Sequence, residues 1–276
     1  MMLIELPDEW LAAEGPDQLA VSVVPVIQDN YVWIIHSRTD YQRVYIVDPG
    51  EAAPVIEAIE RHQWQPQAIL NTHRHWDHVT GIEALVQRYQ LPVYAPAGET
   101  IPCETDKLAE GDEIAFEQDQ LRFKILDIFG HTEGHIAYLT DMPGLKVQAV
   151  FSGDTLISLG CGRLLGGTAE QLHQSLQKLR HLPASTIVYC THEYTLANIA
   201  FAKAVGFKTD QVNAFEAWCQ SQRQAEKPTV PTTIAREAAL NPFLNTDQKQ
   251  IAAAVQADHR EPQQVFTQLR QWKDRF

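Results

Sequence analysis

Short runs of apolar and β-branched residues alternate with polar turns through the first two-thirds of the chain, and this pattern predicts a β-rich region. We expect strands at residues 20–27, 31–36, 43–47, 68–70, 93–95, 122–129, 136–140, 148–151 and 186–190. Apolar positions with helical spacing predict helices between them, at residues 53–62, 82–89 and 169–182. Strands and helices mixed in this way are typical of an α/β or α+β domain.

The pattern changes near residue 193, where Ala- and Gln-rich segments with helical spacing replace the strands. We expect helices at residues 196–205, 211–225, 251–257 and 263–272, with an interruption at 227–233 that contains Pro228 and Pro231. The chain is therefore expected to form a catalytic domain over residues 1–192 and an all-helical domain over residues 193–276. Residues 1–18 form an N-terminal extension of the first domain.

The charge of the chain narrows the range of partners. Of its 276 residues, 45% are hydrophobic, which is enough for a buried core, and the formal net charge is −13. Nucleic acids and acidic membranes attract basic proteins, so neither is expected as a partner. An anionic substrate needs local positive charge, and bound metal ions would supply it. The acidic surface leaves a monomer or a specific dimer open.

The chain shows no export or membrane signal. Its first apolar run is short and has acidic flanks, and no stretch reaches the ~20 apolar residues of a membrane span. The four cysteines lie far apart and form no CxxC pair, as expected for buried thiols in a reducing compartment. We expect a cytoplasmic protein.

The segment Thr72–His78 reads THRHWDH and places four metal-binding side chains within six positions. Residues two apart on an extended chain share a face, so His73 and His75 can point to one ion. Asp77 and His78 then turn toward a neighbouring point. One loop can thus supply two adjacent metals, and imidazole with carboxylate suits zinc, iron or manganese. A polar surface turn is the alternative, but four such residues at a strand end favour metal binding.

Three later segments place metal-binding residue types directly after apolar strands. They are GHTEGH at 130–135, SGDT at 152–155 and THEYT at 191–195. Ends of strands are where such folds collect their functional side chains. These segments can therefore complete the metal site that Thr72–His78 begins.

Together with GCGR at 160–163 and NPF at 241–243, these motifs make residues 20–245 resemble the metallo-β-lactamase superfamily and, within it, the glyoxalase II or hydroxyacylglutathione hydrolase family. The resemblance implies an αββα sandwich followed by a helical substrate-binding domain. It also implies two divalent metal ions per chain, with zinc preferred and iron or manganese as alternatives. The implied ligands are His73, His75 and His135 for the first ion, Asp77, His78 and His192 for the second, and Asp154 bridging both. His131 is expected to support the site without binding metal.

The resemblance implies hydrolysis of a glutathione thioester, S-D-lactoylglutathione, to glutathione and a 2-hydroxy acid, which is the second step of methylglyoxal detoxification. In such a family a hydroxide held by two metals would attack the thioester carbonyl, and Asp77 and Asp154 would be the catalytic carboxylates. Arg163 and Tyr194 are the expected substrate contacts, with Lys249 as a further candidate. The family's usual side chains are replaced at the positions of Leu165, Gly166 and Asn245.

Other readings remain open at this stage. The same fold can serve a hydrolase of another thioester, an ester or a lactone, a mono-iron persulfide dioxygenase, or a metal-binding module without catalysis. Seven ligand positions favour two metals and hydrolysis. Asp48 is either a carboxylate that orients a ligand histidine or an ordinary turn residue. Isolated histidines are expected at the surface or in the core: His36, His62, His173, His181 and His259.

Overall fold

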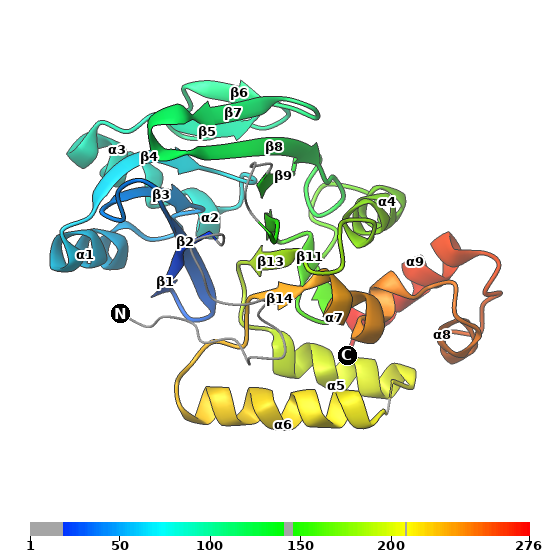
Figure 1. Cartoon of the computed structure of the whole chain (residues 1–276). Coiled ribbons are helices and arrows are strands. Elements are labelled where there is room, and N and C mark those ends of the chain that lie inside the picture. The colour runs from blue at the N-terminus through cyan, green and yellow to red at the C-terminus, as the bar shows by residue number, and fades with distance from the viewer. Residues whose placement is uncertain (1–18, 141–145, 208) are drawn as a thin grey trace.

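The computed structural model describes residues 19–140, 146–207 and 209–276, so the expected N-terminal extension lies outside the described residues. Within these ranges, two six-stranded sheets lie face to face and helices cover their outer sides (Figure 1). The expected αββα sandwich is confirmed. No helix in the described ranges combines the length and apolar character needed to cross a membrane.

The first sheet contains the amino-terminal strands in chain order. They are β1 (Val21–Val26), β2 (Asn30–His36), β3 (Arg43–Val47), β4 (Gln65–Leu70), β5 (Val93–Pro96) and β6 (Asp106–Leu108). The pairs from β3 to β6 are parallel, with helices α1 (Ala52–His62) and α3 (Ile82–Tyr89) in the connections. Parallel strands need such crossovers, and their carboxyl ends meet at one edge of the sheet.

The second sheet is mostly antiparallel. Its order is β14 (Thr232–Thr233), β13 (Ile187–Cys190), β10 (Ala149–Gly153), β9 (Ile136–Thr140), β8 (Leu121–Asp127) and β7 (Glu113–Phe116). The parallel pair β10 and β13 is connected through the hairpin β11 (Leu156–Ile157) and β12 (Gly160–Cys161), followed by helix α4 (Ala169–Arg180). This connection matters for the site because residues on both sides of the hairpin reach it.

Strand periodicity explains the layers. On β2, the side chains of Trp33 and Ile35 face the second sheet, whereas Val32 and Ile34 pack toward α1 and α3. Successive residues of a strand point to opposite faces, so a strand buried on both sides is apolar throughout. The facing strands contribute inward side chains in the same alternation: Phe123, Ile125, Ile136, Tyr138 and Phe151.

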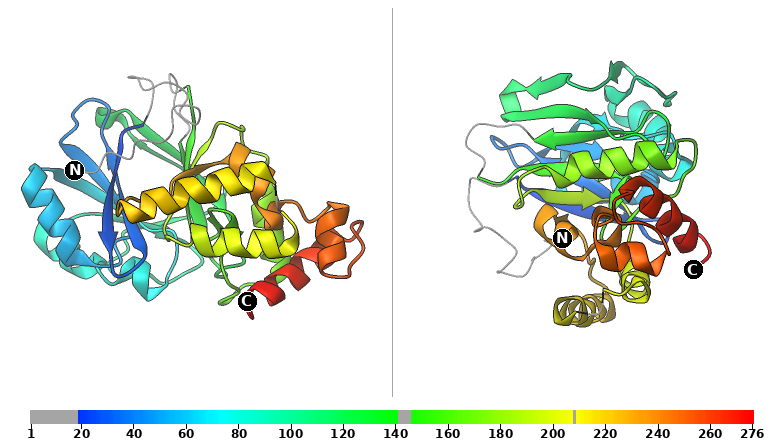
Figure 2. Two further views of the ribbon diagram at one scale, coloured as in Figure 1. Left: turned by 90° about the horizontal axis from the view of Figure 1, so that it is seen from below. Right: turned by 90° about the vertical axis from the view of Figure 1, so that its right-hand side faces the viewer.

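The carboxyl-terminal helices share a hydrophobic core with α4 and with outward side chains of the second sheet. They are α5 (Thr195–Val205), α6 (Asp210–Gln224), α7 (Ile234–Leu240), α8 (Lys249–Ala254) and α9 (Pro262–Lys273). Figure 2 shows them gathered on the side of the molecule away from α1 and α3. The expectation of an all-helical segment after residue 192 is wrong in one respect, because β14 extends the second sheet from within it.

All of the strands and helices expected from the hydrophobic pattern are present, with ends that move by a few residues. The elements that the pattern missed are short: β6, β7, β11, β12, β14, the helix α7, the one-turn helix α2 (Trp76–Val79) and the 3₁₀ helices at Glu117–Asp119 and Pro242–Leu244. β6 and β7 lie at the edges of their sheets and expose several side chains. Strands of this kind need little alternation of apolar and polar residues, so the hydrophobic pattern does not predict them.

Candidate metal centre

The first metal-binding segment follows β4, where the chain leaves the first sheet. The strand ends at Leu70, and His73 and His75 lie in the extended loop beyond it rather than on the strand. Asp77 and His78 lie on helix α2. Because the chain bends between the loop and the helix, His73 and His75 point to one place and Asp77 and His78 to another, as the spacing predicts.

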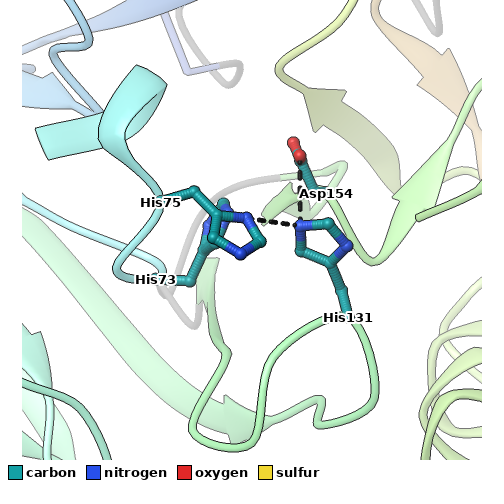
Figure 3. Close-up of side chains that lie close together, drawn as sticks. All are labelled: His73, His75, His131 and Asp154. Carbon is teal, nitrogen blue, oxygen red and sulfur yellow. Dashed lines mark hydrogen bonds and ion pairs between the residues drawn. The ribbon is translucent and has the colours of Figure 1, made fainter. Parts of the chain in front are cut away.

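Three imidazole nitrogens meet in a first ligand group (Figure 3). Nδ1 of His75 lies 3.1 Å from Nε2 of His73 and 2.9 Å from Nε2 of His131. Oδ2 of Asp154 lies 3.4 Å from the same His131 nitrogen. All four ligand atoms lie within 4.8 Å of one another. Tetrahedral zinc places its ligand atoms about 3.4 Å apart, so one cation fits this group with small adjustments.

The electrostatics of the first group favour neutral imidazoles. Burial lowers the pKa of His73 and of His131, and it lowers the pKa of His75 to about 4. A neutral imidazole keeps a lone pair, and that lone pair is what binds a metal. The three rings are therefore in the protonation state that a cation requires.

His131 takes the place that the resemblance assigns to His135. Nδ1 of His131 donates to the Arg163 carbonyl oxygen at 2.8 Å, which leaves the Nε2 lone pair facing the first group. In His135, Nδ1 donates to the Ile136 carbonyl oxygen at 3.0 Å, and Nε2 accepts from the Asp154 backbone N–H at 3.2 Å. Both ring nitrogens of His135 are occupied. The geometry therefore favours His131 over His135 as the ligand.

A second ligand group lies beside the first. It consists of Asp77, His78 and His192, whose ligand atoms also lie within 4.8 Å of one another. His192 follows β13, and its Nε2 lies 3.6 Å from Oδ2 of Asp77. Nε2 of His78 lies 3.8 Å from the same oxygen. The second sheet thus supplies one member of a group whose other two members come from the first.

Asp154 faces both groups. Its Oδ2 lies 3.1 Å from Nε2 of His192, its Oδ1 lies 3.4 Å from Nε2 of His78, and it also approaches His131 as described above. Burial raises the pKa of this carboxyl, but the neighbouring His192 and His78 outweigh burial and hold the pKa well below its usual value. An ionised carboxylate between two ligand groups is placed to contact a cation in each.

The residues present fit metal ions. Nε2 of His78 is fully buried and has no hydrogen-bond partner among the described residues. A cation bound beside this nitrogen would give it a direct partner, which the Asp154 carboxylate 3.4 Å away does not. The set of imidazoles and carboxylates around it is one that zinc, iron and manganese accept.

Asp48 orients the ligand histidines of the first sheet. Its side chain accepts hydrogen bonds from Nδ1 of His78 at 3.2 Å and from the Thr72 hydroxyl at 2.6 Å. The Thr72 oxygen lies 3.1 Å from Nδ1 of His73. Asp48 also accepts from the Thr72 backbone N–H and from Asn71. Of the two readings of Asp48, the structure favours the orienting carboxylate over the ordinary turn residue.

The turn between β1 and β2 supplies two residues that sequence reasoning missed. Oδ1 of Asp29 lies 3.3 Å from Nδ1 of His192, and Nδ2 of Asn30 donates to Oδ2 of Asp77 at 3.1 Å. A backbone bridge between Asn30 and His192 brings this turn to the end of β13. In the sequence the pair is indistinguishable from ordinary turn residues, because the contact spans more than 160 positions.

The expected substrate contacts lie in different surroundings. Arg163 follows β12 and is exposed, and the ring of Tyr194 stacks on His192 with centroids 4.7 Å apart. Lys249 is exposed at the start of α8, a helix that lies away from α2 in Figure 1. Lys273, at the end of α9, was not anticipated. Burial and the nearby charges of Arg270 and Arg163 lower its pKa to about 8.

The two parts of the chain match the models of two known families. Residues 28–192 match the model of the metallo-beta-lactamase superfamily, and residues 193–276 match that of the hydroxyacylglutathione hydrolase C-terminus. A protein of Nitrosomonas europaea named hydroxyacylglutathione hydrolase is 44% identical over 262 residues, which cover 93% of this chain and 97% of that protein.

Solved structures show the same fold. ETHE1 from Myxococcus xanthus aligns with a TM-score of 0.59 and 26% identity, covering 82% of this chain and 83% of that one. TTHA1623, solved in a di-iron-bound form, aligns with a TM-score of 0.56 and 26% identity over 80% of this chain and 98% of that one. The two-sheet fold with its paired ligand groups makes this chain a metal-dependent hydrolase of the metallo-β-lactamase superfamily. Within that superfamily it belongs to the hydroxyacylglutathione hydrolase family.

Proposed function

We propose that the enzyme hydrolyses the thioester of S-(2-hydroxyacyl)glutathione, with S-D-lactoylglutathione as the main substrate, to glutathione and a 2-hydroxy acid. This is the second step of methylglyoxal detoxification. The observation that carries the proposal is the pair of ligand groups sharing Asp154, in a chain 44% identical to a protein named hydroxyacylglutathione hydrolase.

The proposed ligands differ from the expected set at one position, since His131 replaces His135. We assign the first cation to His73, His75, His131 and Asp154, and the second to Asp77, His78, His192 and Asp154. Zinc is the proposed metal, with iron or manganese as substitutes that such donors also accept. When bound, two adjacent cations lower the pKa of a shared water toward neutrality and polarise the substrate carbonyl.

The chain's own residues hold this arrangement in place. Asp48 and Asp29 accept from the outer nitrogens of His78 and His192, which directs the inner nitrogens of both rings into the second group. Asn30 donates to one oxygen of Asp77 and fixes its orientation. The leaving group is the thiolate of glutathione, a weak base that needs little protonation. We therefore assign no general acid.

Recognition of glutathione requires positive charge, because the substrate carries two carboxylates and the chain has a net charge of −13. Arg163 and Lys273 are near enough for their charges to interact, and both belong to segments that meet beside His131. We propose these two cations and the half-exposed Tyr194 as the substrate contacts. Lys273 takes the role considered for Lys249. Asn245 is 1% exposed and is engaged by backbone carbonyls, so it is assigned no substrate contact.

We also propose that the division near residue 192 separates two roles. Residues up to 192 supply the metal ligands, and residues 193–276 supply Tyr194 and Lys273 toward the substrate. The division concerns function more than folding, since the helices share a hydrophobic core with the second sheet.

The first experiment is to count metals in the purified protein by elemental analysis and to compare hydrolysis of S-D-lactoylglutathione with that of acetyl-coenzyme A and a short acyl ester. We expect about two metals per chain, as a binuclear site requires, and a kcat/KM at least tenfold higher for the glutathione thioester. Two metals per chain with no higher kcat/KM for the glutathione thioester would contradict the proposed substrate. One metal per chain would contradict the binuclear site.

A further inference from the structure

Side chains from the helical region, residues 193–276, form hydrogen bonds with successive residues of the loop after β11. Three consecutive backbone groups each bind a side chain from α5, α7 or the residue that follows α7. The bonds join Asn198 Nδ2 to Ser158 O (2.9 Å), Glu237 Oε2 to Leu159 N (2.9 Å) and Asn241 Nδ2 to Gly160 O (2.9 Å). Arg270 of α9 continues the series by donating to the Cys161 carbonyl oxygen at 2.9 Å. We refer to residues 158–163 as the hairpin loop.

The other end of the hairpin loop touches the first ligand group. The Arg163 carbonyl oxygen accepts the hydrogen bond from Nδ1 of His131. Gly162 packs so closely that a Cβ atom there would lie 2.7 Å from the same nitrogen and 2.4 Å from the Asp154 backbone oxygen. A small displacement of the hairpin loop therefore moves the acceptor that sets the direction of the His131 ring.

The side chains that bind the hairpin loop are buried and hydrogen-bonded. Asn241 and Glu237 are completely buried and Asn198 is 6% exposed. Asn241 also donates to Glu237, which accepts a further hydrogen bond from Thr232. Buried amides and carboxylates are costly without partners, so these residues stabilise one position of the loop against its alternatives. None of the three belongs to either ligand group, and their bonds to the loop end on its backbone.

We infer that the helical region positions the metal ligand His131 through the hairpin loop, with Asn241, Glu237 and Asn198 as the positioning residues. The inference rests on the proposed role of His131 as a ligand. It gives residues 193–276 a part in metal affinity in addition to substrate binding. Loss of a hydrogen bond that orients a ligand typically costs 10–100-fold in metal affinity.

The test compares Asn241→Asp with Asn245→Asp. The first substitution removes the donor to Gly160 and places a carboxylate beside Glu237. The matched control removes an equally buried amide donor, whose partners are Ala238 O and Asn241 O and not the hairpin loop. Zn²⁺ is titrated into each metal-free protein in competition with a chromophoric chelator, and the melting temperature is recorded. Both variants should have a lower melting temperature than the parent protein. Only Asn241→Asp should bind one of the two zinc ions at least tenfold more weakly.

Asn198→Ala provides a second variant that buries no new charge, should Asn241→Asp fail to fold. It should weaken the same zinc ion and change the visible spectrum of the Co²⁺-loaded protein. The inference is overturned if the folded loop variants bind both zinc ions as tightly as Asn245→Asp does.

His131→Ala separates this inference from its premise. If His131→Ala keeps both zinc ions, the proposed ligand role fails and the inference falls with it. If His131→Ala loses one zinc ion while the loop variants keep both, the ligand assignment stands and the inference alone is wrong.

Discussion

Several of the proposed ligand histidines direct one ring nitrogen at the ligand groups because an oxygen of the protein holds the other. The holding oxygens belong to Asp48 for His78, Asp29 for His192, Thr72 for His73 and the Arg163 carbonyl for His131. Each such contact fixes the tautomer as well as the direction of the ring. His135 differs because backbone groups occupy both of its nitrogens.

This difference predicts unequal effects of two alanine substitutions. His131→Ala should lower the metal content from about two ions toward one, because it removes a lone pair from the first group. His135→Ala should keep both ions and mainly lower the melting temperature, because it opens a cavity and frees the Asp154 N–H. Elemental analysis of both purified variants, with thermal melts, provides the check. Equal metal loss in the two variants would contradict the assignment.

At this scale the sequence predicts the ligand residue types well. The structure places His73, His75, Asp77, His78, Asp154 and His192 together, as their positions after strands suggested. The choice within GHTEGH could not be made from spacing, because it depends on which backbone carbonyl each ring meets. The same holds for Asp29, which reaches His192 only after the two sheets have packed.

At the scale of elements, α9 brings its last turn to the site. Arg270 binds the hairpin loop, and Lys273 lies over the rings of Phe201 and Phe276 with its amine near Arg163. In the sequence, Lys249 is a candidate because it lies one turn beyond Asn245, where the family usually has an arginine. The sequence does not show that α9 packs against α4 and reaches the hairpin loop, because helical spacing shows which face is buried but not against which element.

The lowered pKa of Lys273 predicts a pH dependence of substrate binding. The amine is charged below about pH 8 and loses its proton as the pH rises through that value. Attraction for a substrate carboxylate is therefore present at pH 7 and weakens above pH 8, so KM should rise severalfold by pH 9. In Lys273→Arg the guanidinium stays charged, and KM should stay flat over this range. The check is KM for S-D-lactoylglutathione from pH 6.5 to 9. If KM depends on pH in the same way in both proteins, Lys273 does not bind the substrate carboxylate.

At the scale of the whole molecule, one apolar core joins the helical region to the sheets. Outward side chains of β8, β9 and β10 pack with α4 and with the helices that follow residue 192. The change of pattern near residue 193 predicts a second domain, and residues after 193 do form mostly helices. The shared core was not visible in the sequence, because an apolar strand face does not reveal what covers it.

The shared core predicts a single cooperative unfolding transition. Calorimetry of the metal-free chain should give one peak with a calorimetric enthalpy close to its van't Hoff enthalpy. A fragment that ends at residue 192 should aggregate or bind a hydrophobic dye, because it exposes the face that α5 to α9 cover. Two separate transitions, or a folded and soluble fragment, would show that the two parts are independent.

The order in which the ligand groups occur along the chain has a consequence for synthesis. His73 to His78 leave the ribosome early, but each group also needs a residue from the second sheet, and His192 is the last of these. The side chains that hold the hairpin loop follow at positions 198 to 270. The first group is complete in the nascent chain once Asp154 has been made, and the second group only once His192 has been made. We therefore expect both metals to be loaded late in folding, and a chain truncated before His192 to lack the second group.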